Sequence, residues 1–241
     1  MLSLRPVRQI IFDNQSFVSG KLILIDKPKG WTSFRVVNRI HHLTRVKTGH
    51  AGTLDPLATG LLICCTGVLT KSIQRYQSMV KEYTGTIVLG AHTPTFDLES
   101  QPIPQGDPSQ IPDDKVQEAL KAFLGPQLQV PPIHSAIKQN GKPVYRLARK
   151  GREVVLSPRP IEIYELEGRR VQTDQMEFRV VCSTGTYIRS LTQDLGQWLG
   201  CGAYLGSLCR TRIGDYSLDQ AQTLEQFESS LGQFGKEDQK G

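Results

Sequence analysis

Apolar residues along this chain follow two different periods in short, irregularly alternating segments, and this pattern restricts the fold more than any other feature. Lys81–Gly90 and Met176–Cys182 alternate apolar and polar residues, as half-buried strands do. Residues 33–43 and 183–200 instead repeat apolar positions at helical spacing. Hairpin signals are more evident than regular strand–helix–strand units, so the sequence predicts an α+β domain around a largely antiparallel sheet.

The remaining elements follow from turn and cap residues between these segments. Further strands are expected at Lys21–Asp26, Leu61–Cys65, Ile161–Leu166 and Ala203–Tyr216. Lys47–Gly60 has no period and is expected to be a loop. Shorter helices are predicted around residues 69–76 and after Asp113, and the helix over 183–200 is expected to turn four side chains inward: Ile188, Leu191, Leu195 and Trp198.

The short apolar runs also exclude whole classes of protein. The longest, near Leu22–Ile25 and Leu61–Cys65, reach about five residues, whereas a membrane-spanning helix needs roughly 20. A secretory signal peptide is excluded for the same reason. The five cysteines are odd in number and show no CxxC pair, so we expect reduced core thiols in a cytoplasmic protein.

Positive charge is concentrated in two places. Residues 1–55 hold nine basic and three acidic residues, in a chain with a net charge of +6. Six more cations without an acid follow in a second cluster: Lys138, Lys142, Arg146, Arg149, Lys150 and Arg152. Within the first cluster, Arg35, Arg39 and His42 form a basic helical stripe, and within the second Asn140 and Gly141 predict a tight turn. Such local excess is typical of a polyanion-binding face, although two solvated basic surfaces would give the same composition.

One loop carries the strongest chemical signal. In GHAGTLDP, residues 49–56, glycines border a carboxylate and Pro56 restricts the backbone of Asp55 to extended geometry. Asp55 could act as a nucleophile, a general base or a ligand, or could only close a turn within the loop. A phosphate-binding P-loop is excluded, because no GK[ST] follows the glycines.

The residues around this loop carry a resemblance to a known family. The segments LILIDKPKGWTS, GHAGTLDPLATGLL, KEYTGTIVLGAHTPTFD, VPPIHSAIKQNGKPVYRLARKG, STGTYIRSLTQDLG and CGAYLGSLCRTRIG occur in this order. Together they resemble the TruB-type bacterial tRNA pseudouridine-55 synthases over nearly the whole chain. The resemblance implies the pseudouridine synthase fold with a basic RNA-binding projection, the T-arm stem-loop of tRNA as partner, and isomerisation of uridine 55 to pseudouridine after base flipping.

The resemblance also implies roles for individual residues. Asp55 matches the catalytic aspartate, which either attacks the sugar C1′ or removes the C2′ proton, and Arg189 matches the arginine that pairs with it. Tyr83 matches the tyrosine that stacks on the target uracil. His50 matches the histidine that fills the space left by the flipped base. Tyr187 and Leu208 match positions that line the uracil pocket, and Lys27 matches the family's first motif, which buttresses the pocket. From the charge of the second cluster, we expect phosphate contacts by four of its cations: Lys138, Lys142, Arg146 and Arg149.

The resemblance implies that no cofactor, metal or membrane is involved and that the protein acts as a monomer. We expect an N-terminal extension over 1–20, a catalytic domain over 21–217 and a short C-terminal helix with an acidic tail over 218–241. Many members of the family also carry a C-terminal RNA-binding domain of the PUA type, and here the chain departs from them, because the residues after Tyr216 are too few for such a domain. Ala51 stands where many members have Thr. A tRNA-folding chaperone and a sister synthase acting on another RNA remain alternative interpretations.

Overall fold

The computed structural model describes residues 15–133, 135, 138–139, 142–143 and 156–237. The chain forms two compact units, and each unit is built from segments that are not consecutive in the sequence. Among the described residues, the first unit comprises those within 1–56, 60–77 and 217–241, and the second unit comprises those within 57–59 and 78–216.

The first unit is a small antiparallel sheet covered by helices. Strand β3 (Thr59–Thr66) pairs with β1 (Leu22–Lys27) and with β2 (Thr48–His50). The helical elements of this unit are α1 (Gln15–Ser19), α2 (Ser33–Thr44), the 3₁₀ helix η1 (Gly67–Ser72), α3 (Ile73–Gln77), η3 (Leu218–Gln220) and α7 (Leu224–Glu237). Side chains of α2, α7 and the strands form one apolar core, which includes Ile25, Ile40, Leu62 and Phe227. Burial of these faces holds the helices against the sheet.

Helix α2 forms where the sequence predicts it, with defined ends. Thr32 has extended backbone geometry, and its hydroxyl accepts a hydrogen bond from the Arg35 amide at 3.1 Å, as an N-cap does. Arg45 adopts the left-handed conformation at φ 58° and donates its amide to the His41 carbonyl at 2.7 Å, which ends the helix.

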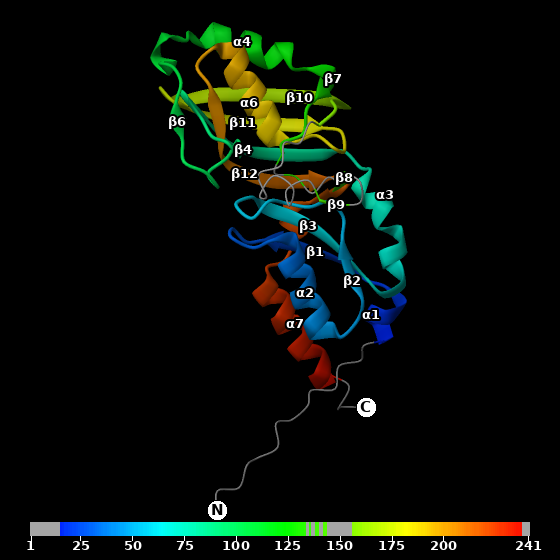
Figure 1. The fold of residues 1–241 in the computed structure, drawn as a ribbon. Coiled ribbons are helices and arrows are strands. Elements are labelled where there is room, and N and C mark those ends of the chain that lie inside the picture. Colours follow the sequence, from blue (N-terminus) through cyan, green and yellow to red (C-terminus); the bar gives the residue numbers. More distant parts are fainter. Residues whose placement is uncertain (1–14, 134, 136–137, 140–141, 144–155, 238–241) are drawn as a thin grey trace, which may run out of the picture. The chain divides into compact units, whose positions relative to one another are not determined.

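The second unit is built on a larger sheet, with strand order β12-β4-β11-β10-β7 and antiparallel pairs throughout this path. The bounds are β4 (Lys81–Leu89), β7 (Gly125–Gln129), β10 (Arg159–Gln172), β11 (Gln175–Cys182) and β12 (Ala203–Ile213). Helix α6 (Ile188–Leu199) packs on β12, and α4 (Asp113–Ala122) packs on α6 and β10, so both helices cover the same face of the sheet (Figure 1).

The minor elements of the second unit are short: β5 (Ala91–His92), β6 (Ile103–Pro104), the 3₁₀ helix η2 (Pro108–Gln110), β8 (Lys138–Gln139) and β9 (Lys142–Pro143). The two residues of β13 (Tyr216–Ser217), which follows β12, belong one to each unit. Within the described ranges, no helix combines the length and the apolar character needed to cross a membrane.

The predicted α+β class with antiparallel strands is confirmed, with local corrections. The segment Lys47–Gly60 is not entirely loop, because Thr48–His50 forms β2 and the last two residues of the segment begin β3. The helix predicted over 183–200 begins only at Ile188. The prediction that Trp198 points inward is wrong: its exposed fraction is 42%, because the buried stripe continues from Leu195 to Leu199 at i+4.

The cysteines follow the prediction of core thiols. The described residues contain all five, none in a disulfide, and four of them are buried. Burial raises the pKa of Cys65 and that of Cys182 to about 11.

Candidate active site

Asp55 lies half-buried in the loop between β2 and β3, and a buried hydroxyl fixes the backbone beside it. The Ser33 hydroxyl donates to the Leu54 carbonyl at 3.1 Å and accepts from the Leu54 amide at 2.8 Å. Gly52 turns the loop at φ 90°, a conformation that side chains other than glycine rarely adopt. Leu54, the residue directly before Asp55, is therefore held at both its amide and its carbonyl. These two bonds fix the loop backbone that carries the Asp55 carboxylate.

Lys27 ties the end of β1 to the same loop. Its side chain is fully buried, and its ammonium donates to the carbonyls of Pro28 at 3.1 Å, Trp31 at 2.6 Å and Pro56 at 3.4 Å. The Gly30 amide also donates to the Pro56 carbonyl at 2.8 Å. Because Pro56 directly follows Asp55, these bonds position the loop from its other side. His50 belongs to this unit as well: it ends β2, opposite Cys64 of β3.

Tyr83 and Leu208 lie on one face of the sheet of the second unit. In the register of β4 and β12, Tyr83 is opposite Arg210 and Gly85 is opposite Leu208. Cross-strand partners point to the same side of a sheet, so Tyr83, Leu208 and Arg210 share a face. Tyr83 and Arg210 are buried, and the sequence analysis missed Arg210 because an isolated arginine in a strand gives no local signal of burial.

Arg189 and Tyr187 are positioned at the start of α6. Arg189 is 4% exposed; its guanidinium donates to the Thr95 carbonyl at 3.2 Å, and its Nε lies 3.7 Å from a carboxylate oxygen of Asp97. The Tyr187 amide donates to the Gln129 side-chain oxygen at 2.8 Å, and the Gln129 amide group donates to the Tyr187 carbonyl at 3.1 Å. These contacts fix both residues from segments that are distant in sequence, which no sequence pattern revealed.

A second buried cation stands two residues before Tyr83 on the same strand. The Lys81 ammonium donates to the Met79 carbonyl at 2.6 Å. Burial, followed by the charge of Arg210, lowers the pKa of Lys81 to about 8. Of the predicted site residues, the second unit thus carries Tyr83 and Leu208 on β4 and β12 and Tyr187 and Arg189 at the start of α6, while Asp55, His50 and Lys27 belong to the first unit.

The predicted basic surfaces are only partly as expected. Arg35 and His42 are exposed on α2, but Arg39 is not available as the stripe predicted, because it makes a two-pronged ion pair with Glu228 of α7 at 2.6 and 2.7 Å. In the second cluster, Lys138 and Lys142 lie on the paired strands β8 and β9, with two residues between the strands. Arg146, Arg149 and the predicted turn at Asn140 and Gly141 lie outside the described residues.

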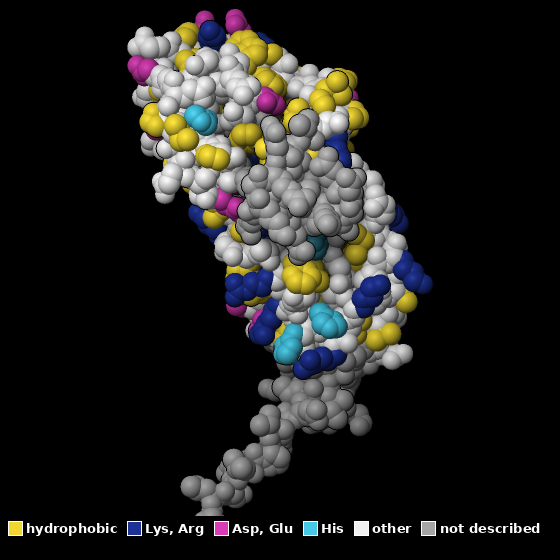
Figure 2. All heavy atoms as spheres, viewed as in Figure 1, with side chains coloured by type: hydrophobic (Ala, Val, Ile, Leu, Met, Phe, Trp, Pro, Cys, Tyr) yellow, Lys and Arg dark blue, Asp and Glu magenta, His cyan; other side chains and the backbone are white. Residues whose placement is uncertain are grey.

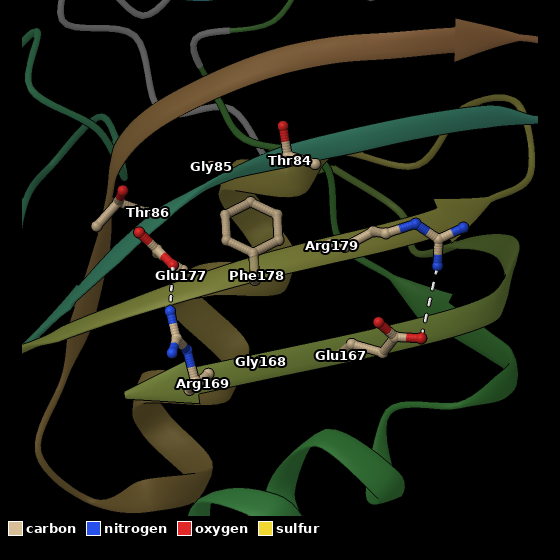
Figure 3. Close-up of a pocket in the computed structure, with 9 residues that line it drawn as sticks. All are labelled: Thr84, Gly85, Thr86, Glu167, Gly168, Arg169, Glu177, Phe178 and Arg179. Carbon is tan, nitrogen blue, oxygen red and sulfur yellow. Dashed lines mark hydrogen bonds and ion pairs between the residues drawn. The ribbon is translucent and has the colours of Figure 1, made fainter. Parts of the chain in front are cut away.

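A shallow hollow of about 500 Å³ lies on the sheet of the second unit, lined by residues of β4, β10 and β11 (Figure 3). Ion pairs cross it from Arg169 to Glu177 at 3.3 Å and from Arg179 to Glu167 at 3.6 Å. None of its lining residues belongs to the predicted site. Among the residues that the structure describes, no three His, Cys, Asp or Glu side chains are grouped as metal ligands would be.

Comparison with known families gives two adjacent matches. Residues 39–188 match the TruB family pseudouridylate synthase N-terminal domain, and residues 189–240 match the tRNA pseudouridylate synthase B C-terminal domain. A relative named tRNA pseudouridine synthase B from Flavobacterium johnsoniae is 46% identical over 90% of this chain and 98% of its own length. Its namesake from Phocaeicola vulgatus is 46% identical over 90% of this chain and 96% of its own.

Solved structures agree with these sequence matches. A structure titled "Crystal Structure of a Cbf5-Nop10-Gar1 Complex" contains a chain that superposes with a TM-score of 0.73 at 29% identity, over 96% of this chain and 59% of that one. A second, titled "Structure of H/ACA RNP bound to a substrate RNA containing 2'-deoxyuridine", superposes with a TM-score of 0.69 at 28% identity, over 94% of this chain and 58% of that one. This chain thus spans somewhat under two thirds of those longer chains. The matched domains and the similarity over almost the full length of bacterial relatives show that the chain belongs to the TruB family of pseudouridylate synthases.

Proposed function

We propose that this protein isomerises uridine 55 in the T loop of tRNA to pseudouridine. The observation that carries the proposal is the 46% identity to relatives named tRNA pseudouridine synthase B, over nearly their whole length. The loop that bears Asp55 supports it, since bonds from Ser33 and Lys27 hold the residues on either side of the carboxylate.

The reaction is redox-neutral and leaves the composition of the uridine unchanged, because the substrate exchanges one hydrogen with solvent. The N1–C1′ glycosidic bond breaks, the uracil turns, and a C5–C1′ bond forms. N1 ends with a proton, and the hydrogen originally on C5 is released to solvent. The target base must leave its stack before any of these atoms is reachable, at a cost of a few kcal/mol.

Within this reaction we assign the carboxylate chemistry to Asp55, either as nucleophile at C1′ or as base at C2′. Both roles need the ionised form, which a neighbouring guanidinium favours, and Arg189 supplies that guanidinium in the proposal. The burial of Arg189 and its bond to the Thr95 carbonyl support a fixed rather than a mobile charge. Tyr83 stacks on the uracil and takes part in the later proton transfer.

The remaining site residues bind and position the RNA in this proposal. Tyr187 and Leu208 line the uracil pocket, His50 fills the space left by the flipped base, and Lys27 buttresses the loop. The phosphates of the T arm are contacted by Lys138, Lys142, Arg146 and Arg149, with residues 21–217 as the catalytic domain between the extension over 1–20 and the segment over 218–241. The isolated T-arm stem-loop suffices as a substrate, because it holds both the target uridine and the phosphates that these cations neutralise. The protein acts as a monomer in the cytoplasm.

Pseudouridine mapping on defined transcripts tests the function. The purified chain is incubated with unmodified tRNA, with the same tRNA carrying cytidine at position 55, and with the T-arm stem-loop. We expect pseudouridine at position 55 of the first and third RNA and at no position of the second. Modification at another position would indicate a sister synthase, and tight binding of tRNA without any pseudouridine would indicate a chaperone.

A further inference from the structure

The first turn of α2 carries an aromatic side chain that is exposed to solvent. Phe34 is 67% exposed, although it lies in a helix, where phenylalanine forms helix less readily than unbranched residues do. The position therefore gains neither burial nor helix propensity from the ring. Single exposed apolar residues are ordinary on protein surfaces, so the surroundings of Phe34 have to decide whether it has a role.

Beside Phe34, a guanidinium is stacked on a second aromatic ring. The Arg35 guanidinium carbon lies 3.8 Å from the centroid of the Trp31 ring, and Trp31 itself packs against the core of the first unit. Stacking holds a guanidinium plane in one orientation while its N–H edge stays available for a phosphate. The Trp31 ring, which is anchored on the core, therefore restricts the position of the Arg35 guanidinium.

The rest of this helix face is positive or neutral. Phe34, Asn38 and His41 follow one another at i, i+4 and i+7, a spacing that places them along one side of the helix, and all are exposed. Arg35 and His42, seven residues apart, are exposed beside them, and Arg45, which ends the helix, is exposed too. Helix α2 contains no acidic residue, and the carboxylate of Glu228 is taken up by Arg39. Figure 2 shows histidine, lysine and arginine side chains gathered with hydrophobic ones over the region of α2.

We propose that this α2 face, defined by Trp31, Phe34, Arg35, His42 and Arg45, is a second RNA-contact surface, on which an unpaired nucleobase of the tRNA stacks against Phe34 while Arg35 and Arg45 contact the adjoining phosphates. Aromatic rings interleaved with cations are the arrangement that binds single-stranded nucleic acid, since every base has a face that can stack. The inference rests on the proposed function for the identity of the RNA. The face contains none of the residues assigned to catalysis or to the uracil pocket.

Charge complementarity favours RNA over a protein partner or a second copy of this chain. A protein-docking patch would gain from several neighbouring apolar side chains, whereas here a single exposed phenyl ring is surrounded by cations and polar groups. A stacked base needs only one ring and nearby positive charge. Self-association through this face would instead place like charges against each other.

Binding and kinetics of Phe34→Ala test the stacking step. Loss of one base–aromatic stack should raise the Kd and KM for tRNA about 5- to 150-fold, without changing the single-turnover rate at saturating tRNA. Phe34→Tyr keeps the ring and should restore wild-type affinity. Leu128→Ala is the matched control, because Leu128 is also an exposed apolar residue, at 73%, and lies on β7 of the other unit. Thermal unfolding should be unchanged in Phe34→Tyr and close to wild type in Leu128→Ala, and Phe34→Ala should unfold at a slightly higher temperature, because alanine forms helix more readily.

Salt dependence tests the phosphate contacts separately. Arg35→Gln should flatten the slope of log Kd against log salt by about 0.7 to 0.9, as expected for one lost phosphate contact. Wild-type Kd, KM and salt slope in both Phe34→Ala and Arg35→Gln, with the wild-type enzyme active, would overturn this inference alone. Tight tRNA binding without pseudouridine by the wild type would overturn the proposed function instead. A wild-type protein that dimerises and becomes monomeric in Phe34→Ala, with unchanged tRNA affinity, would assign the face to a protein contact.

Discussion

The α2 face of the first unit and the open sheet face of the second unit both carry arginines, but these arginines have different neighbours. On the sheet, Arg169, Arg179 and Arg212 each lie within 3.3 Å of a carboxylate. On α2, Arg35 lies against the Trp31 ring. A paired guanidinium holds its own protein together, whereas one stacked on a ring still presents its N–H groups outward. The neighbours of a cation, more than the number of cations, therefore distinguish a structural surface from a binding surface.

Glu82 is the centre of the charge network on the sheet. Its carboxylate accepts from the Thr211 hydroxyl at 2.7 Å, from Arg179 at 2.7 Å and from Arg212 at 3.3 Å. Burial by itself would raise the pKa of Glu82, but the bonds from Thr211 and Arg179 and the charges of both arginines outweigh it and lower the pKa. The network thus favours the ionised carboxylate and ties β4, β11 and β12 together.

The largest expected effect follows from neutralising this centre. Glu82→Gln should lower the free energy of unfolding by about 2 kcal/mol at neutral pH, because two guanidiniums lose a charged acceptor. The folded-state pKa of Glu82 is lowered, so its contribution is present above the unfolded-state pKa and is lost as pH falls through the folded-state value. Denaturant unfolding of wild type and variant should therefore converge in acid, while tRNA affinity at neutral pH stays the same. A variant as stable as the wild type would show that the sheet charges are not structural.

The next largest effect reverses the charge on the other surface. Arg35→Glu should weaken tRNA binding about tenfold, about 1.4 kcal/mol, since a phosphate contact is replaced by repulsion. The free energy of unfolding of Arg35→Glu should be slightly higher than that of wild type, because a glutamate three residues after Thr32 completes a capping box in the first turn of α2. Arg169→Glu on the sheet is the matched control and should leave tRNA affinity within about twofold. Equal losses of affinity from both reversals would remove the distinction between the two surfaces.

The smallest expected effect concerns Arg39 of α2, which is paired with a carboxylate, as the sheet arginines are. Arg39 is paired with Glu228, and both side chains are partly exposed, so Arg39→Gln should lower the free energy of unfolding by less than about 1 kcal/mol. The salt slope of tRNA binding should not change. A slope flattened as much as in Arg35→Gln would mean that Arg39 leaves Glu228 to bind RNA.

Elements with strong local patterns could be predicted from the sequence. β4 and α2 form as expected, because alternation or helical spacing matches burial and Thr32 caps the helix. Strand β10 runs to Gln172, beyond the predicted Leu166, because its later residues gain their order from pairing with β11 rather than from their own pattern. The position of Trp198 was mispredicted because periodicity does not show which of two adjacent apolar residues faces the core, and Leu199 takes the buried position.

The candidate site could be predicted only as a set of residues. The resemblance to TruB-type synthases selected Asp55, Tyr83 and Arg189, but it gave no sign of how they are held. The supporting contacts from Ser33 to Leu54, from Thr95 to Arg189 and from Gln129 to Tyr187 join segments 21 to 94 residues apart. Such long-range hydrogen bonds leave no periodic or motif signal in one sequence, and they depend on the packed fold.

Release of tritium from tRNA labelled at C5 of its uridines, measured for wild type and Asp55→Asn, tests the central claim most directly. The amide has nearly the shape of the carboxylate but can act neither as nucleophile nor as base. We predict no release above background by Asp55→Asn, with tRNA affinity within a few-fold of wild type and an unchanged unfolding transition. Release by Asp55→Asn near the wild-type rate would contradict the assignment of Asp55 as the carboxylate on which this isomerisation depends.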